Sequence, residues 1–221
     1  MLLQKLKEYA ARSPAADLPP MYLATPIKWL IHLDQEGKFL GFVSTSSGTK
    51  KKNDRGKEYP APSLVRAYGI KPKLLADRAD YVLGFIEEDA KPKDKKRAQD
   101  CHNAFVALIK ECVRATRAPE VLAVEKFLDN LDLTTLSLPA DISSGDNVTF
   151  VVDGTMPIDL QGVREFWAQT QASSEEVAQC LVCGKLKPPM KRQPIKVKGI
   201  PGGQPSGMAL VSANAAAFES Y

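Results

Sequence analysis

The segment PIKWLIHLDQEGKFLGFV, residues 26–43, decides the fold of the N-terminal part of this chain. Two runs rich in aromatic and β-branched residues, 27–33 and 38–43, flank the short connection from Asp34 to Gly37. A glycine at the end of such a connection supplies the positive φ that a tight turn with a bulge needs. The segment therefore predicts a β-hairpin with Gly37 in its turn.

Downstream of residue 94 the apolar residues change to a helical period. Five of them recur three or four residues apart and so share one face of a helix: Cys101, Phe105, Leu108, Ile109 and Cys112. A second helix can begin at Pro119, because proline is well tolerated in the first helical turn. A third, shorter helix is predicted over residues 159–170. The pattern therefore places several helices in the middle of the chain.

Strands are predicted on both sides of these helices. The runs YVLGF, 81–85, and NVTFVVDG, 147–154, have the composition of strands. CLVCGK, 180–185, and GMALVSANA, 207–215, are predicted as strands that flank a basic, glycine-rich loop. Strands early, helices in the middle and strands again indicate an α+β fold, with an antiparallel sheet that contains the hairpin.

The bulk composition is typical of a soluble protein, with 44% hydrophobic and 25% charged residues among 221. No apolar run approaches the ~18 residues of a membrane span, and the first residues lack the apolar segment of a signal peptide. We therefore expect a cytoplasmic protein with no membrane partner. Thiols stay reduced in that compartment, so no disulfide is expected among the four cysteines, Cys101, Cys112, Cys180 and Cys183.

Positive charge is segregated along the chain, although the net charge is only +4. Residues 50–57 and 91–97 each hold five basic residues against one acidic residue, and residues 185–198 hold six and none. Segregated positive charge is the expected footprint of nucleic-acid binding. The alternative is that each run is simply a solvated loop.

The glycine-rich loop near residue 200 does not have the pattern of a nucleotide-binding loop. A P-loop requires a lysine directly after its second glycine. With Gly202 and Gly207 as the two glycines, that position holds Met208. Nucleotide hydrolysis by this loop is therefore not expected.

The pair Cys180 and Cys183 forms half of a zinc knuckle, because tetrahedral zinc needs two further ligands. Cys101, His102 and Cys112 could supply them, but all three lie on a predicted helix, and the place of Cys101 and Cys112 on its apolar face favours burial in the core. We therefore expect no metal and no cofactor.

Catalytic side chains are also not evident. The two histidines have no partner arrangement for nucleophilic or general-base chemistry, and Asp153 and Asp159 are interpreted as part of a turn. The chain is therefore expected not to be an enzyme. Two alternatives stay open: a metal-dependent nuclease that uses Asp153 and Asp159, and an RNA-binding module with a zinc knuckle at Cys180 and Cys183.

Four segments carry a family resemblance: PPMYLATPIKWLIHLDQEGKFLGFV (19–43), RGKEY (55–59), GIKPKLLADRADYVLG (69–84) and GIPGGQPSGMALVSANAAAFESY (199–221). Together they resemble the N-terminal region of the CRISPR-associated large subunit of type I-C effector complexes, the Csd family. The closing segment is the most specific of them. One departure is Cys183, where family members often carry threonine, which further weakens the zinc interpretation.

The resemblance implies a non-catalytic subunit of an RNA-guided antiviral complex. Guide pairing reads the target in such complexes, and protein reads a short flanking motif, the PAM, on duplex DNA. The implied partners are this duplex, the guide RNA near its 5′ handle, the other subunits and a recruited helicase-nuclease. Residues 1–221 are then expected to be the N-terminal domain of a longer subunit. A scaffold that contacts only proteins is the remaining alternative.

Candidate contacts with nucleic acid follow from the basic segments, since lysine and arginine bind phosphates. They are Lys50, Lys51, Lys52, Arg55 and Lys57 beyond the hairpin, Lys71, Lys73 and Arg78 beside a proline-stiffened segment, and Lys191, Arg192, Lys196 and Lys198 before the glycine-rich loop. In that loop, glycine permits close approach and polar side chains can contact bases. The candidates there are Gly202, Gly203, Gln204 and Ser206. Alternatively, residues 199–207 form only a tight turn in which Gln204 is bonded internally.

Overall fold

The chain divides into two units, Met1–Gln171 and Ala172–Tyr221. The computed structural model describes residues 18–47, 54–64, 66, 69–171, 177–179, 184–187, 201–204 and 207–208, together with Lys5, Glu8 and Arg12. In the second unit, the described strands are β7 (Ala178–Gln179) and β8 (Leu186–Lys187), which form an antiparallel pair. All the elements treated below belong to the first unit.

The predicted hairpin is confirmed. Strands β2 (Trp29–Leu33) and β3 (Phe39–Ser44) pair antiparallel, and Gly37 has a φ of 81° in the turn between them. Asp34 closes this turn, because its carboxylate accepts hydrogen bonds from the Glu36 and Lys38 backbone N–H groups at 2.9 and 2.8 Å. The first strand begins at Trp29 rather than Ile27, since Ile27 ends an earlier strand.

Two sheets make up the β structure of this unit. The larger has the order β3-β2-β6-β5, where β5 is Ala76–Arg78 and β6 is Asn147–Val152. The smaller pairs β1 (Tyr22–Ile27) with β4 (Lys57–Pro62) antiparallel. The α+β class is confirmed, but the larger sheet is mixed, because β2 and β6 run parallel. A parallel pair requires a long crossover, and the helical region between these two strands provides it.

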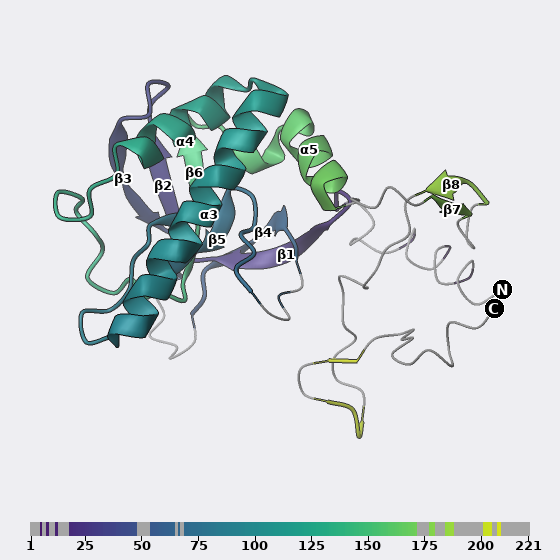
Figure 1. Ribbon diagram of the computed structural model, residues 1–221, viewed down its shortest axis with the longest axis horizontal. Helices are drawn as coiled ribbons and strands as arrows, with labels where there is room; N and C mark the ends of the chain where they lie inside the picture. The colour runs from purple at the N-terminus through teal and green to yellow at the C-terminus, as the bar shows by residue number, and fades with distance from the viewer. Residues whose placement is uncertain are drawn as a thin grey trace. The chain divides into compact units, whose positions relative to one another are not determined.

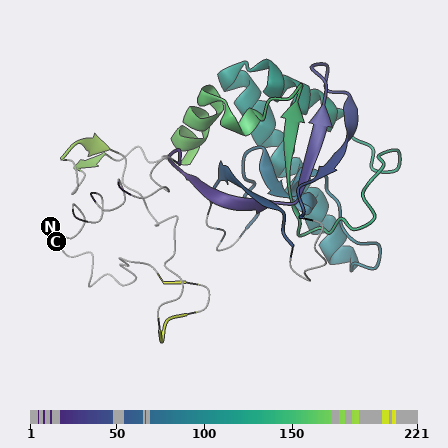
Figure 2. The same ribbon diagram turned by 180° about the vertical axis from the view of Figure 1, so that it is seen from behind.

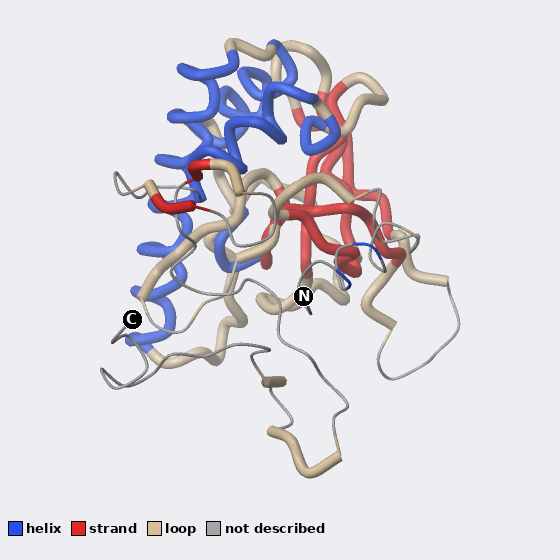
Figure 3. Tube along the Cα trace, turned by 90° about the vertical axis from the view of Figure 1, so that its right-hand side faces the viewer, coloured by secondary structure: helices blue, strands red, loops and turns tan. Residues whose placement is uncertain are grey.

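The helices cover one face of the larger sheet. They are α3 (Pro92–Thr116), α4 (Pro119–Asp129) and α5 (Gln161–Gln171). The long helix α3 crosses in front of the strands in Figure 1 and behind them in Figure 2. Figure 3 shows these helices gathered to one side of the strands. All five apolar residues predicted on one face of α3 are buried, so that face is the one that packs on the core.

The expected strand YVLGF is wrong, because Tyr81 and Val82 belong to a short helix, α2 (Ala79–Val82). Strand β5 ends at Arg78, and the backbone N–H groups of the next two residues donate hydrogen bonds to the loop before β6. Ala79 N–H donates to the Asp146 carbonyl at 2.9 Å, and Asp80 N–H donates to the Ser144 carbonyl at 3.1 Å. A short buried apolar run fits a strand and a buried helix equally well, so periodicity alone could not separate them.

Cys101 and Cys112 are fully buried in the core, which confirms their structural interpretation. Burial raises the pKa of the Cys112 thiol to about 11. Such a thiol stays protonated at neutral pH and is a poor metal ligand. Across the parts of the chain with described positions, no helix has both the length and the apolar composition to span a membrane.

His102 joins α3 to α2 and makes folding sensitive to pH. Its Nδ1 lies 3.1 Å from the Val82 carbonyl oxygen and 3.3 Å from the Tyr81 carbonyl oxygen. Both neighbours are acceptors, so Nδ1 carries the proton of the neutral ring. Burial lowers the pKa of His102, and these two backbone hydrogen bonds only partly oppose it.

We therefore expect acid to destabilise the protein through His102. The unfolded state, with an ordinary histidine pKa of about 6.5, binds the proton more tightly than the folded state. Stability is complete above that value and is lost as the pH falls through it towards the lower folded pKa. Urea denaturation at pH 7.5, 6.5 and 5.5 measures this loss. His102→Gln should flatten the slope between these points, and parallel profiles for the two proteins would contradict the assignment.

Candidate nucleic-acid interface

The two sheets meet at Lys28, the residue between β1 and β2. Its backbone N–H donates to the Asn147 carbonyl at 3.0 Å, and its carbonyl accepts from the Thr45 N–H at 3.0 Å. The Asn147 side chain adds a bond from its amide nitrogen to the Pro26 carbonyl at 2.8 Å. Lys28, Thr45 and Asn147, which we call the sheet junction, thus link the ends of β1, β3 and the start of β6.

Arg55 and Lys57 lie at the sheet junction. Lys57 opens β4 opposite Ile27, and its N–H donates to Thr45 Oγ1 at 2.9 Å. Both side chains are exposed, and no carboxylate within the described ranges forms a salt bridge with either. Two positive side chains that are two residues apart and have no carboxylate to balance them create a positive potential that attracts an anion.

Lys57 also lies beside an aromatic ring. Its Nζ is 5.6 Å from the ring centroid of half-buried Tyr59, two residues along the same strand. Residues i and i+2 of a strand share a face. A lysine over a partly exposed ring combines a phosphate contact with a stacking surface, a pairing common in proteins that bind single strands.

Gly56 holds Arg55 and Lys57 in place. Its φ is +84°, and a Cβ built there would collide with the Ile27 carbonyl and with Thr45 Oγ1. The Gly56 N–H donates to Asp54 Oδ1 at 2.9 Å, and the other oxygen of Asp54 accepts from the Ser47 N–H at 2.9 Å. The last residue before the segment 48–53 is thereby bonded to the first residue after it. Lys50, Lys51 and Lys52 belong to that segment and lie outside the described residues.

Arg78 comes to the same junction from β5, where it pairs with Asn147. Its guanidinium, however, is already engaged within the protein. It forms an ion pair with Asp80, in which Nε donates to Oδ1 at 3.0 Å, and its Cζ lies 5.7 Å from the Tyr81 ring centroid. The charge of Arg78 is therefore largely balanced before any ligand arrives. Lys28 is balanced in the same way by Asp146, at 2.9 Å.

Asp77 anchors the segment that carries Lys71 and Lys73. Its fully buried carboxylate forms an ion pair with Arg66 and accepts hydrogen bonds from the Lys73 and Arg78 N–H groups at 2.8 Å each. Arg66 also donates from Nε to the Lys71 carbonyl at 2.7 Å. Its Cζ lies 4.1 Å from the Tyr81 ring centroid. The Asp77 carboxylate thus holds the backbone of Lys73 directly and the backbone of Lys71 through Arg66.

The side chain of Lys73 is half-buried, whereas that of Lys71 is exposed. Burial lowers the pKa of Lys73, the charge of Asp77 opposes this, and the nearby Arg66 and Arg78 lower it further. A half-buried ammonium beside two guanidinium groups is costly in free energy. An added anion would relieve that cost, because it reduces the repulsion among the three cations.

The remaining sequence candidates belong to the second unit. Lys191, Arg192, Lys196, Lys198 and Ser206 lie outside the described residues. Gly202 has a φ of +75°, and the Gly207 N–H closes a turn by donating to the Gln204 carbonyl at 2.9 Å. This bond is the described part of the predicted turn over residues 199–207, in which the Gln204 backbone is bonded and its side chain is exposed. A contact between Gln204 and nucleic acid stays a prediction.

Sequence reasoning missed Arg66 and the aromatic partners Tyr59 and Tyr81. Each tyrosine follows a basic residue by two or three positions, in KEY (57–59) and RADY (78–81). Such short spacing can bring a cation and a ring together, within β4 in the first case and across the junction of β5 with α2 in the second, so it was a usable signal. Arg66 had no local signal, because its partner Asp77 is eleven residues away.

The two aspartates of the nuclease alternative are each engaged elsewhere. Asp153 accepts a hydrogen bond from Gln35 Nε2 at 2.7 Å, and Asp159 forms an ion pair with Arg164 at 2.7 Å. Among the residues whose positions are described, no group of three or more His, Cys, Asp or Glu side chains could hold a metal ion. Cys180 and Cys183, the residues of the zinc alternative, lie outside the described residues.

Comparison with protein families gives a match over nearly the whole chain. Residues 3–221 match the family described as CRISPR-associated protein (Cas_Csd1). A search of curated proteins found no match.

Proposed function

The chain belongs to the CRISPR-associated Csd1 family, and from this premise we propose that it is a non-catalytic, nucleic-acid-binding subunit of a type I-C effector complex. Its ligand is the PAM-bearing duplex beside the sequence that the guide RNA reads. The subunit grips this duplex near the 5′ handle of the guide RNA, helps to open it, and offers a surface to a recruited helicase-nuclease.

One observation supports this proposal above the others: Arg55 and Lys57, on either side of Gly56 at the sheet junction, are both exposed and have no salt bridge inside the described structure. The Lys57 N–H donates to Thr45 Oγ1 and the Gly56 N–H donates to Asp54 Oδ1, so the backbone that carries both cations is held in place. A backbone that is already ordered loses no further entropy when its side chains bind a phosphate. They are therefore the first choice for backbone contacts with the duplex.

Lys73 and Arg78 have a different role in this proposal. Arg78 is paired with Asp80, and Asp77 bonds the backbone N–H groups of both residues. We assign Lys73 and Arg78 a positioning role. Arg78 borders Asn147, and both residues add positive potential, whereas Arg55 and Lys57 contact the phosphates.

The direct test is duplex binding by the reconstituted effector complex at several salt concentrations. The double variant Arg55→Gln with Lys57→Gln removes two phosphate contacts. The slope of log K against log salt should then become less steep by about 2, close to 0.9 per contact. Affinity should fall for PAM-bearing and PAM-scrambled duplexes alike, because phosphate contacts carry no sequence information.

A matched control is Lys93→Gln with Lys96→Gln, which removes the same charge from exposed positions near the start of α3. This variant should bind as the unmodified protein does. An equal loss of duplex affinity in the control would mean that net charge alone causes the effect. An unchanged salt slope in the Arg55 and Lys57 variant would overturn the assignment of these two residues as phosphate contacts.

The nuclease alternative gives a separate result in the same material. Gln35 and Arg164 occupy the two aspartates it requires, which favours the non-catalytic proposal. Magnesium-dependent cleavage of the duplex by this chain, lost in Asp153→Asn, would establish the alternative instead. No cleavage is expected with or without magnesium.

A further inference from the structure

Strand β3 is the edge of the larger sheet, and within the described structure β2 is its one strand partner (Figure 1). An edge strand leaves a row of backbone donors and acceptors without partners. Proteins usually protect such edges with charged side chains or proline, because another chain can otherwise pair there.

The hydrogen bonds at both ends of the hairpin fix which groups of β3 face outward. Asp34 N–H donates to the Lys38 carbonyl at 3.1 Å, and Thr45 N–H donates to the Lys28 carbonyl at 3.0 Å. In an antiparallel pair, bonded and non-bonded residues alternate. From this phase and the register, Gly41 and Val43 bond to β2, whereas the backbone groups of Phe42 and Ser44 point to the open edge.

The sequence of β3, FLGFVS, contains no charged residue and no proline. Two of its apolar side chains are strongly exposed, Leu40 at 62% and Val43 at 46%. Strand β4 of the smaller sheet is a useful contrast within the same chain. Its sequence, KEYPAP, carries a lysine, a glutamate and two prolines, which is the usual protection. The register of β3 shifts at Leu40, so the regular open edge without such protection is residues 41–44.

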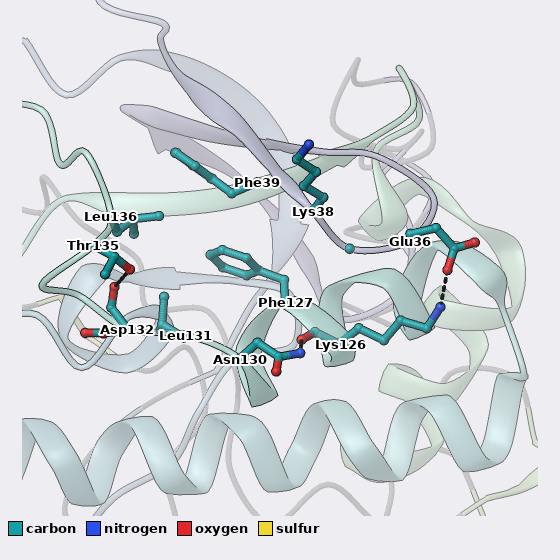
Figure 4. Close-up of a pocket in the computed structure, with 11 residues that line it drawn as sticks. Glu36, Lys38, Phe39, Lys126, Phe127, Asn130, Leu131, Asp132, Thr135 and Leu136 are labelled. Atoms are coloured by element: carbon teal, nitrogen blue, oxygen red, sulfur yellow. Dashed lines mark hydrogen bonds and ion pairs between the residues drawn. The ribbon is translucent and has the colours of Figure 1, made fainter.

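A groove of about 350 Å³ adjoins the start of β3, between the hairpin turn and the end of α4. Figure 4 shows Phe127, Leu131 and Leu136 around it, with Phe39 on the β3 side. These four apolar side chains line one part of the groove, and most of the other lining side chains are polar or charged. The groove is large enough to hold one large apolar side chain.

The charged side chains at the rim of this groove differ in whether a counter-charge balances them. Lys126 is bonded to Glu36 at 2.8 Å, and Asp132 accepts from the Thr134 hydroxyl at 2.7 Å. Lys38, by contrast, has no salt bridge to any described carboxylate. Asp132 keeps its negative charge, because Thr134 is neutral, so Lys38 and Asp132 are the two rim charges without a described counter-charge and a ligand carboxylate is favoured only beside Lys38.

We propose that β3 receives an extended segment of another protein subunit of the effector complex as an added strand. The segment pairs with the backbone of Phe42 and Ser44 and covers Leu40 and Val43. It places one large apolar side chain in the groove and a carboxylate beside Lys38. Strand addition of this kind takes its affinity from main-chain bonds and its specificity from side-chain pockets. The proposal rests on membership in a multisubunit complex, but it does not depend on nucleic-acid binding.

Hydrogen exchange of the full chain, alone and in the reconstituted complex without DNA, tests this pairing. The Phe42 and Ser44 amides should exchange at least about tenfold more slowly in the complex, because each gains a hydrogen bond. The Gly41 and Val43 amides already bond to β2 and should change far less. Unchanged exchange at Phe42 and Ser44 would overturn the proposal, and equal protection of all four amides would indicate general burial instead of a paired strand.

A variant gives an independent result. Leu40→Lys with Val43→Lys places charges on exposed positions of the edge and should reduce incorporation of the chain into the complex by about tenfold or more. Leu122→Lys, at another exposed apolar position on α4, is the matched control and should assemble normally. Protection that appears on raising the concentration of this chain alone would identify a second copy as the occupant and overturn the assignment.

These outcomes separate from those for the duplex. A loss of strand pairing with normal duplex binding would refute only the β3 proposal. Normal protection at β3 together with an unchanged salt slope for the Arg55 and Lys57 variant would refute only the proposed phosphate contacts.

Discussion

Replacing Asp77 with alanine is expected to lower the free energy of unfolding by about 3–5 kcal/mol. The carboxylate is fully buried, pairs with Arg66 and accepts N–H groups from Lys73 and Arg78. Its removal leaves a partly buried guanidinium without a counter-charge and two backbone donors without an acceptor. Urea denaturation followed by tryptophan fluorescence measures the loss, and a value below about 1 kcal/mol would contradict this account.

Two further substitutions separate charge from hydrogen bonding. Asp77→Asn keeps the shape and one acceptor oxygen but removes the negative charge, so its loss should lie between those of the unmodified protein and Asp77→Ala. Asp132→Ala removes an exposed carboxylate that bonds only its neighbour Thr134 and should cost less than about 0.5 kcal/mol. If Asp77→Asn is as stable as the unmodified protein, the ion pair with Arg66 contributes nothing.

Replacing Gly37 with alanine is expected to destabilise the protein by about 2–6 kcal/mol, because two costs add. The φ of +81° is unfavourable for alanine, at about 1–3 kcal/mol. A Cβ at this position would also lie 2.4 Å from the Ala123 carbonyl oxygen and 2.9 Å from Lys126 Cβ, in helix α4. Overpacking against backbone costs about 1–3 kcal/mol more.

Gly154 offers a control with the same backbone conformation. Its φ is also +81°, but nothing lies within 4 Å of a Cβ built there. Gly154→Ala should therefore cost only the conformational part, and the difference between the two variants measures the contact between the hairpin turn and α4. Equal losses in thermal or urea denaturation would mean that α4 moves away freely.

Local sequence was sufficient for much of the fold. The hairpin, the buried face of α3, the start of α4 at Pro119 and the strand β6 were all predicted from residues close together in the chain. The parallel pairing of β2 with β6 was not, since strand partners more than a hundred residues apart leave no local pattern. The helix α2 was missed for a similar reason, because the backbone of Ala79 and Asp80 bonds to the loop before β6.

The candidate site divides in the same way. A basic run gave Arg55 and Lys57 as candidates, and a proline-stiffened segment gave Lys73 and Arg78. The sequence could not tell that Arg78 and Lys73 are tied to Asp80 and Asp77 while Arg55 and Lys57 have no described salt bridge. That distinction depends on which carboxylates the fold brings within a few ångströms.

By itself, the sequence determined the periodic elements, the turn at Gly37, the charge segregation and the family, because each depends on residue type and near spacing. Only the tertiary structure decided that Lys57 and Arg78 border the sheet junction at Thr45 and Asn147, that Gly37 contacts α4, and that β3 is an open edge. Coulomb forces, close packing and strand pairing act between atoms close in space, and the folded chain alone sets those distances.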